Sequence, residues 1–303
     1  MESFKTFDND MNKGKAETQK NIKNKKLYIC IIVLIALVLF FIGFVEVQRY
    51  IFFHPWNNVA AYEQLKEIQW LEEVNIDNNW SKLNWWLYYN NQKWEKSPLL
   101  IFFQWNAMCS SNTMLSFWKQ WILDNYFSWY NVLIVDYPWY GYSEWKIWEK
   151  AMYGSADAIY QWAIKQVYVD SDNIVIMGYS IWTWIATYCA SNNKVNWLIL
   201  VAPYDNAINL YNSVLNIFYG PIKLLAKYRF DSLSYAENVD SEVQIITSYD
   251  DEIINYKLSQ NLMGGFKKHK DIVILDNWVK HNNYFYQEKV LDTIKEYLLE
   301  RLK

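Results

Sequence analysis

The chain has 303 residues, enough for one large domain with a full core, and a formal net charge of −3 at neutral pH. Because its folded portion contains no block of basic residues, a nucleic-acid partner is not expected. The three cysteines, Cys30, Cys109 and Cys189, show neither a disulfide framework nor metal-ligand spacing, and three histidines are too few for a multi-histidine metal site.

The N-terminal region predicts a membrane anchor. Residues 27–45 are uncharged and almost wholly apolar, which is long enough for a helix to cross a bilayer. Lysines crowd the preceding residues, so the positive-inside rule places residues 1–26 in the cytoplasm as a disordered tail and the rest of the chain across the cell membrane. A cleaved signal peptide is the alternative, but the run is long for one and no small-residue cleavage site follows it.

After a linker at residues 46–66, residues 67–303 have the pattern of an α/β domain. Two early strands are predicted to pair as a hairpin across an Asn-rich turn. Six short runs rich in Val, Ile, Leu and Phe then fit strands buried on both faces of a parallel sheet. The eight predicted strands are residues 67–76, 82–89, 99–103, 131–135, 173–177, 197–201, 243–247 and 271–275.

Helical patterns alternate with these strands, which is typical of a mostly parallel sheet with helices on both faces. The predicted helices are residues 113–123, 151–166, 181–190, 253–263 and 284–302. An insertion at residues 203–240 interrupts the alternation and contains predicted helices at 207–219 and 222–228. Its position favours a small cap over the carboxyl ends of the strands, where its Leu, Tyr and Ile residues fit either an acyl pocket or simple packing.

The segment Gly178-Tyr179-Ser180-Ile181-Trp182 lies where a strand ends and a helix begins. It matches the G-x-S-x-G nucleophile elbow except at its fifth residue, where an indole is not expected to fit. A serine nucleophile needs a base, and the base needs an orienting acid. His281 follows the last predicted strand and Asp251 follows the seventh, which gives the chain order Ser, Asp, His.

Other residues compete for these roles. Asp250 and Asp205 also follow predicted strands and are alternatives to Asp251 as the acid. His54 is close to the membrane anchor, and His269 lies in a Lys-rich turn that favours a solvated side chain. Cys109 has no neighbour that would favour a reactive thiolate and is interpreted as structural.

Tryptophan is over-abundant and glycine scarce, with 18 Trp against 8 Gly. Many tryptophans stand in tight turns, where glycine is expected. We hypothesise that UGA codons of an organism that reads UGA as Gly have been translated as Trp; the alternative is a Trp-rich binder of carbohydrate or lipid. Exchanging ten positions would reverse the counts: Trp80, Trp85, Trp105, Trp129, Trp139, Trp145, Trp182, Trp184, Trp197 and Trp278.

Five motifs in order across the domain resemble the α/β-hydrolase family, and within it the membrane-anchored Bem46-like and serine-aminopeptidase-like hydrolases. They begin at Gln104 (H-G-N-A in the family), Asp136 (D-Y-x-G-Y-G), Gly178 (G-x-S-x-G), Asp251 (D-x-x-I) and His281 (H-N-D). Three of them carry Trp where the family has Gly. The resemblance implies an α/β-hydrolase fold with Ser180 as nucleophile, His281 as base and Asp251 as acid.

Two departures from the family pattern stand near this site. Gln104 replaces a usual His, and Lys280 replaces a Gly that is common before the catalytic His. The backbone N–H groups of Ile181 and Asn106 are predicted to form the oxyanion hole, and an indole at Trp105 would displace the loop that holds Asn106.

The sequence thus predicts a serine hydrolase that cleaves an acyl ester, thioester or amide, with no cofactor or metal. A small-molecule or lipid-derived acyl substrate is expected because of the membrane anchor and the apolar cap. The competing hypothesis is an inactive α/β-hydrolase that serves as a membrane-anchored binding or scaffold protein, which Gln104, Lys280 and Trp182 favour.

Overall fold

The computed structural model describes residues 2–78, 81–90, 95–144, 147–214, 216–268, 270–276 and 278–300. The chain divides into two compact units, residues 1–51 and residues 52–303. Among the expectations above, those for Trp80, Trp145 and His269 fall outside the described residues.

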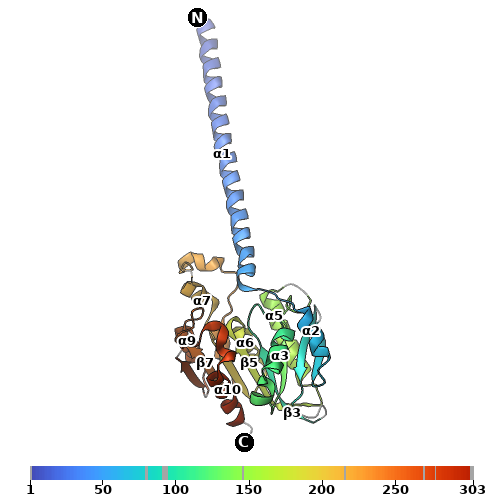
Figure 1. Ribbon diagram of the computed structural model, residues 1–303. Coiled ribbons are helices and arrows are strands. Elements are labelled where there is room, and N and C mark those ends of the chain that lie inside the picture. Colours follow the sequence, from blue (N-terminus) through green and yellow to red (C-terminus); the bar gives the residue numbers. More distant parts are fainter. Residues whose placement is uncertain are drawn as a thin grey trace. The chain divides into compact units, whose positions relative to one another are not determined.

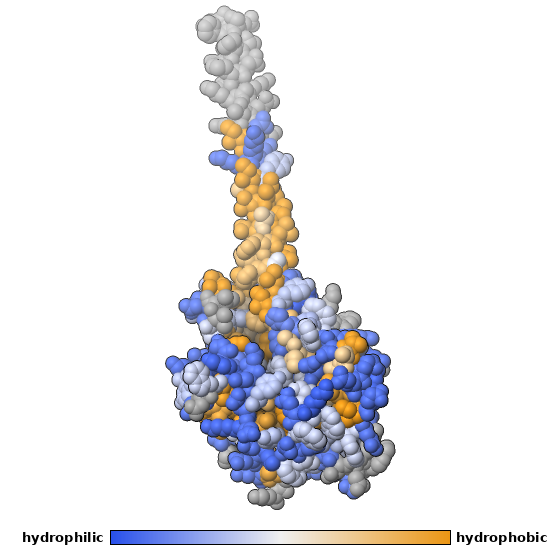
Figure 2. Space-filling model, in the orientation of Figure 1, coloured by the Kyte–Doolittle hydropathy of each residue, from blue (hydrophilic) through white to orange (hydrophobic). Residues whose placement is uncertain are grey.

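The first unit is a helix, α1 (Glu2–Phe52). Its segment Asn21–Phe52 is long and apolar enough to cross a membrane, and Figure 2 shows a hydrophobic band along it. The helix is longer than the predicted span: residues 2–26, expected as a disordered tail, are helical here. Lysine, which propagates a helix well, is abundant among these residues, and the first proline of the chain is Pro55.

The expected linker at residues 46–66 is also partly helical. Its first residues complete α1, and α2 (Val59–Lys66) occupies its second half. The Asn58 side chain caps α2 by accepting a hydrogen bond from the backbone N–H of Ala61 at 3.0 Å. The short α2 therefore begins the second unit with a fixed N-terminus.

An eight-stranded sheet forms the centre of the second unit, with strand order β1-β2-β4-β3-β5-β6-β7-β8. Figure 1 labels β3, β5 and β7 of this sheet. The strands β1 and β2 form the predicted antiparallel hairpin, and β2 pairs antiparallel with β4. All other neighbours are parallel. The strands are β1 (Leu71–Asn78), β2 (Ser81–Tyr88), β3 (Ser97–Phe103), β4 (Asn131–Val135), β5 (Val169–Tyr179), β6 (Trp197–Val201), β7 (Glu242–Ser248) and β8 (Lys270–Leu275).

All eight predicted strands are present, with shifted ends. Two strand starts shift by four residues. β1 begins later than expected because the backbone turns there after α2, and β5 begins earlier, at Val169. Every residue of β4 and β6 is buried, as the continuous apolar runs predicted.

Helices cover both faces of the sheet. Phe102 of β3 packs on Phe117 of α3 with ring centroids 5.9 Å apart, while Ile101, next to it in the strand, points to the opposite face. The helices α4 and α10 contact each other, and α6 contacts both α5 and β5. The main helices are α3 (Ser110–Lys119), α4 (Ile122–Tyr126), α5 (Glu149–Ala163), α6 (Thr183–Asn192), α9 (Tyr256–Gly265) and α10 (Glu288–Glu300).

Three predicted helices differ in detail. The helix expected at 113–123 is divided into α3 and α4, because Trp121 adopts a left-handed conformation with φ of 57°. The helix expected at 253–263 begins only at Tyr256, where the Asn255 side chain caps it. The last predicted helix is preceded by a separate 3₁₀ turn, η3 (His281–Tyr286).

The insertion at 203–240 contains α7 (Ala207–Val214), the 3₁₀ helix η2 (Gly220–Leu225) and α8 (Ser232–Ala236). The α-helix expected at 222–228 is thus replaced by a 3₁₀ segment, which has a proline, Pro221, at its start. Phe230 of the insertion stacks on Trp184 of α6 with ring centroids 4.8 Å apart. The insertion therefore lies beside the helix that follows Ser180.

Candidate active site

The backbone at Ser180 has the geometry of a nucleophile elbow. The strand β5 ends at Tyr179, and Ser180 begins the 3₁₀ turn η1 (Ser180–Trp182) with φ of 58°. A non-glycine residue in this left-handed region is strained. Gly178 has to be glycine, because a Cβ atom there would lie 2.6 Å from Ala186 Cβ and 3.0 Å from Thr183 Cα. Strand and helix thus approach closely enough to present the serine at the turn.

Ser180, His281 and Asp251 lie in one hydrogen-bonded row. Ser180 Oγ lies 2.6 Å from His281 Nε2. On the other side of the ring, His281 Nδ1 lies 3.0 Å from Asp251 Oδ1 and 2.9 Å from Asp251 Oδ2. All three residues are buried, and they follow β5, β8 and β7 at the carboxyl ends of parallel strands. This arrangement lets the imidazole accept a proton from the hydroxyl group while the carboxylate orients the ring.

The Asp251 carboxylate is held by three further donors. The backbone N–H groups of Ile253 and Ile254 donate to its Oδ1 at 2.9 and 2.8 Å, and the Tyr284 hydroxyl donates to its Oδ2 at 3.1 Å. The two backbone contacts explain the spacing of the D-x-x-I motif. The tyrosine contact is not part of that motif and could be identified only in the structure.

The competing acids have other partners. Asp250 Oδ2 accepts a hydrogen bond from the backbone N–H of Trp278 at 2.8 Å. Asp205 accepts from the Asn209 side chain at 2.6 Å and from its neighbouring backbone N–H at 2.7 Å, at the start of α7. Of the three candidates, the structure brings Asp251 to His281.

The backbone of His281 is also fixed. Its N–H donates to the Glu252 carboxylate at 3.2 Å, and its carbonyl oxygen accepts from the Tyr179 hydroxyl. Lys280, one residue earlier, has φ of −83°, which any residue adopts. Glycine is therefore not required before the histidine in this chain.

Asn106, in the loop after β3, and Ile181, in the turn η1, are both held by hydrogen bonds. The Asn106 side chain donates to the Phe52 carbonyl at 2.6 Å and accepts from the backbone N–H of His54 at 3.2 Å. The Tyr204 hydroxyl donates to the Ile181 carbonyl at 3.0 Å. Because the Asn106 amide group is occupied in this way, the group left for an oxyanion is its backbone N–H. The role of these two N–H groups remains a prediction.

Gln104 is a buried support of the Asn106 loop. Its Oε1 accepts from the Thr113 hydroxyl, its carbonyl accepts from the Tyr137 hydroxyl at 2.7 Å, and its Nε2 lies 3.4 Å from Asp136 Oδ1. No contact between its side chain and Ser180, His281 or Asp251 occurs in the described part of the chain. Gln104, which stands where the family usually has His, thus contacts the residues that support the Asn106 loop and does not contact the three triad residues.

Asp136 is the buried acid at the centre of this support. Burial raises its pKa to about 7, although the backbone N–H and hydroxyl of Ser110, at 2.6 and 2.7 Å, act in the opposite direction. Gly141 packs directly on it: with φ of 55°, a Cβ atom there would lie 1.9 Å from Asp136 Oδ2. This contact explains the final glycine of the D-Y-x-G-Y-G motif.

Cys109 lies near the same support and is buried. Its Sγ lies 3.2 Å from the Ser111 hydroxyl, and burial is the main cause that raises the pKa of its thiol. A raised pKa favours the neutral thiol over the reactive thiolate. Both observations agree with a structural role for this cysteine.

The tryptophans at glycine-like positions fall into two groups. Trp139 and Trp278 have φ of 78° and 71°, a region that favours glycine, and Trp121, outside the ten positions, has φ of 57°. Trp182, in contrast, has φ of −83° and stacks on Tyr137 with ring centroids 3.6 Å apart. The expectation that an indole cannot fit at the fifth elbow residue is therefore wrong for the backbone.

The hydrogen bonding of the indoles at Trp182 and Trp184 is nevertheless incomplete. Trp182 and Trp184 are fully buried, and their indole N–H groups have no hydrogen-bond partner. A buried donor without a partner costs on the order of 1–3 kcal/mol. Glycine at these two positions would remove both donors.

Solved structures with a similar architecture include esterases and other hydrolases. An esterase of Pyrococcus furiosus matches with a TM-score of 0.58 at 15% identity, over 82% of this chain and 97% of the esterase. The chain has the α/β-hydrolase fold. An esterase of Butyrivibrio proteoclasticus, Est1E, matches with a TM-score of 0.60 at 17% identity, over 76% of this chain and 98% of Est1E.

A third similar structure is acetyl xylan esterase 1 of a Thermoanaerobacterium species, with a TM-score of 0.54 at 12% identity, over 82% of this chain and 95% of the esterase. Est1E has also been solved with ferulic acid bound. No family model matches the sequence, and the search of curated proteins found no match. At these identities the likeness establishes the fold.

Proposed function

We propose that this protein is a serine hydrolase with Ser180, His281 and Asp251 as its catalytic triad. The observation that carries the proposal is the row of contacts from Ser180 Oγ to His281 Nε2 at 2.6 Å and from His281 Nδ1 to Asp251 at 2.9 Å. The strained backbone of Ser180 and the burial of all three residues support it.

In the proposed reaction, Ser180 Oγ attacks the carbonyl carbon of the substrate while His281 Nε2 takes its proton. The negative charge on the carbonyl oxygen is stabilised by the backbone N–H groups of Ile181 and Asn106. His281 then gives the proton to the leaving group, which departs and leaves an acyl group on Ser180. Water, activated by the same histidine, releases the acid and restores the serine.

The substrate class is an acyl ester, thioester or amide, and esters are the first to test because the similar structures are esterases. Fold alone does not fix the substrate. The apolar helix segment Asn21–Phe52, which is long enough to anchor the hydrolase at a membrane, favours a substrate with an apolar acyl group.

Labelling with a fluorophosphonate probe tests the triad, because the probe reacts with an activated serine. In protein made with the native genetic code, we expect Ser180 to be labelled, and Ser180→Ala to abolish both labelling and hydrolysis of p-nitrophenyl esters. Unlabelled Ser180 in a folded sample would favour the competing function, an inactive membrane-anchored binding or scaffold protein.

We further propose that α1 is an uncleaved anchor and that residues 53–303 lie outside the cytoplasm. The apolar segment Asn21–Phe52 and the lysines before it support this topology. Protease added to intact spheroplasts should digest the hydrolase unit and leave the short N-terminal segment protected. Protection of the hydrolase unit would reverse the orientation, and a mature chain without residues 1–45 would indicate a cleaved signal sequence.

Finally, we propose that the chain is related to the Bem46-like and serine-aminopeptidase-like hydrolases and that several of its tryptophans stand for glycine. The positive φ of Trp139 and Trp278 and the unpaired indole N–H groups of Trp182 and Trp184 support this proposal. Trp121 joins the candidates on the same backbone evidence. Tryptic peptides of the native protein that carry Trp at 139 and 182 would contradict it.

A further inference from the structure

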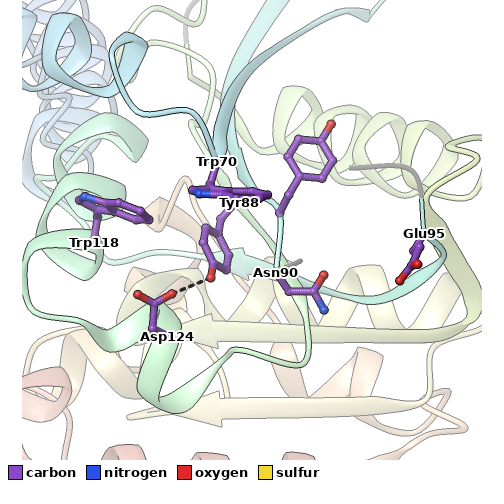
Figure 3. A pocket seen from close by; sticks show the side chains of 7 residues that line it. Trp70, Tyr88, Asn90, Glu95, Trp118 and Asp124 are labelled. Carbon is purple, nitrogen blue, oxygen red and sulfur yellow. Dashed lines mark hydrogen bonds between the residues drawn. The ribbon is translucent and has the colours of Figure 1, made fainter. Parts of the chain in front are cut away.

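A cavity of about 480 Å³ lies at the end of the sheet opposite to Ser180. Tyr88, which lines it, pairs with Val132 near the start of β4, whereas Ser180 follows the end of the parallel strand β5. Figure 3 shows the side chains around it. Its lining consists of Trp70, Tyr88, Tyr89, Asn90, Glu95, Trp118 and Asp124.

Three of the lining aromatic residues are held by regular structure. Tyr88 ends β2 and is buried, and its ring centroid lies 6.4 Å from that of Trp118 on α3. Trp70 precedes β1, and its carbonyl accepts a hydrogen bond from the backbone N–H of Tyr89 at 3.0 Å. Trp70 and Trp118 are not among the ten glycine-like positions, and Trp118 lies inside a helix, where glycine would be unfavourable.

The charged residues that line the cavity in the described part of the chain are both acidic. The Tyr88 hydroxyl donates to Asp124 Oδ1 at 2.8 Å, which fixes one carboxylate at the base of the aromatic group in Figure 3. Glu95 adds a second carboxylate, and among the residues that the structure describes, none that lines the cavity is Lys, Arg or His. The π-faces of Trp and Tyr are also electronegative, so both kinds of group attract positive charge.

We propose that this cavity binds an organic cation that carries a methylated ammonium group. Such a group is weakly hydrated and needs no hydrogen-bond acceptor, so it can rest on the faces of Trp70 and Trp118 while Asp124 and Glu95 balance its charge. A neutral sugar would stack on the same rings and leave both carboxylates without a counter-charge. The volume is that of a site for one small molecule.

The test uses choline as the probe and the full chain, made with the native genetic code, in micelles of octaethylene glycol dodecyl ether, a detergent with neither an ammonium group nor a sugar. Binding is measured by titration calorimetry. Choline should bind, and its neutral isostere 3,3-dimethylbutan-1-ol should bind at least about tenfold more weakly, because it lacks the charge that the rings and carboxylates attract. Methyl xyloside should not compete with choline.

Two variants and a control locate the binding. Trp118→Leu keeps an apolar side chain and removes the π-face, and Asp124→Asn removes one charge; each should weaken choline binding by about three- to tenfold. Trp148→Leu, at an exposed tryptophan outside the lining, should not change it. Unchanged thermal unfolding shows that the variants fold.

Three results would overturn the proposal. They are equal binding of the neutral isostere, undiminished binding in a folded Trp118→Leu variant, and no choline binding at millimolar concentration. Competition by methyl xyloside together with equal binding of the isostere would identify the cavity as a sugar platform instead. None of these results depends on the activity of Ser180.

Discussion

Tyr284 lies in the turn η3 and contacts the acid of the triad. Its hydroxyl donates to Asp251 Oδ2 at 3.1 Å. Tyr284→Phe should lower kcat for p-nitrophenyl acetate by about three- to tenfold at unchanged KM, because one donor that orients the carboxylate is lost. Tyr286→Phe, an exposed hydroxyl in the same turn, is the control and should be neutral. A larger effect at Tyr286 than at Tyr284 would contradict this role.

Asp136 is predicted to make stability depend on pH. Its pKa of about 7 in the folded protein is raised by burial above the value of about 3.9 expected for the unfolded chain. The folded state therefore holds this proton more tightly, so the stabilisation is complete below about pH 4 and is lost as the pH rises through about 7. In Asp136→Asn this fall should be absent from Tm measured across that range. An Asp292→Asn variant, with an exposed carboxylate, should keep it.

At the scale of elements, the contact between β5 and α6 determines whether the elbow can form. Gly178→Ala places a Cβ atom 2.6 Å from Ala186 Cβ, so strand and helix must separate. We expect a lower Tm by several degrees and loss of most esterase activity, since overpacking costs about 1–3 kcal/mol. The control Gly264→Ala meets no atom within 4 Å and lies in α9, so it should be neutral or stabilising.

A double variant tests whether a steric clash causes the expected effect of Gly178→Ala. Gly178→Ala combined with Ala186→Gly removes the Cβ atom that the new methyl group would meet. The double variant should recover part of the lost activity. If it is no better than Gly178→Ala alone, the contact with Ala186 is not what requires glycine at this position.

At the scale of the whole molecule, the tryptophans at glycine-like positions are expected to lower the free energy of unfolding. Each misplaced indole costs about 1–3 kcal/mol through overpacking, whereas a domain has only about 5–15 kcal/mol in total. Positive φ at Trp139 and Trp278 adds to this cost. The chain as written should therefore be poorly soluble and inactive, and the chain with Gly at the ten positions should fold and hydrolyse p-nitrophenyl esters.

Trp118→Gly is a matched control. Trp118 lies inside the helix α3, where glycine is unfavourable, so this variant should destabilise the folded chain. Tm and esterase activity are the measurements. Equal stability and activity of the Trp and Gly versions would show that the tryptophans are native.

The sequence alone determined the order of strands and helices and the residues of the candidate triad. Apolar runs of buried strands are local signals, as are an elbow serine and acidic and basic residues placed directly after strands. The residues Ser180, Asp251 and His281 follow different strands of one sheet, and the parallel topology brings such positions to one edge.

Only the tertiary structure decided which neighbours surround these residues. In the structure, Asp251 contacts His281, whereas Asp250 and Asp205 have other partners. Gln104 accepts a hydrogen bond from Tyr137 and supports the Asn106 loop, and the Tyr284 hydroxyl donates to Asp251. The structure also showed that Trp182 needs no left-handed backbone while Trp121 has one. These outcomes depend on the direction of side chains and on φ angles set by distant packing, and no short pattern in a sequence encodes either.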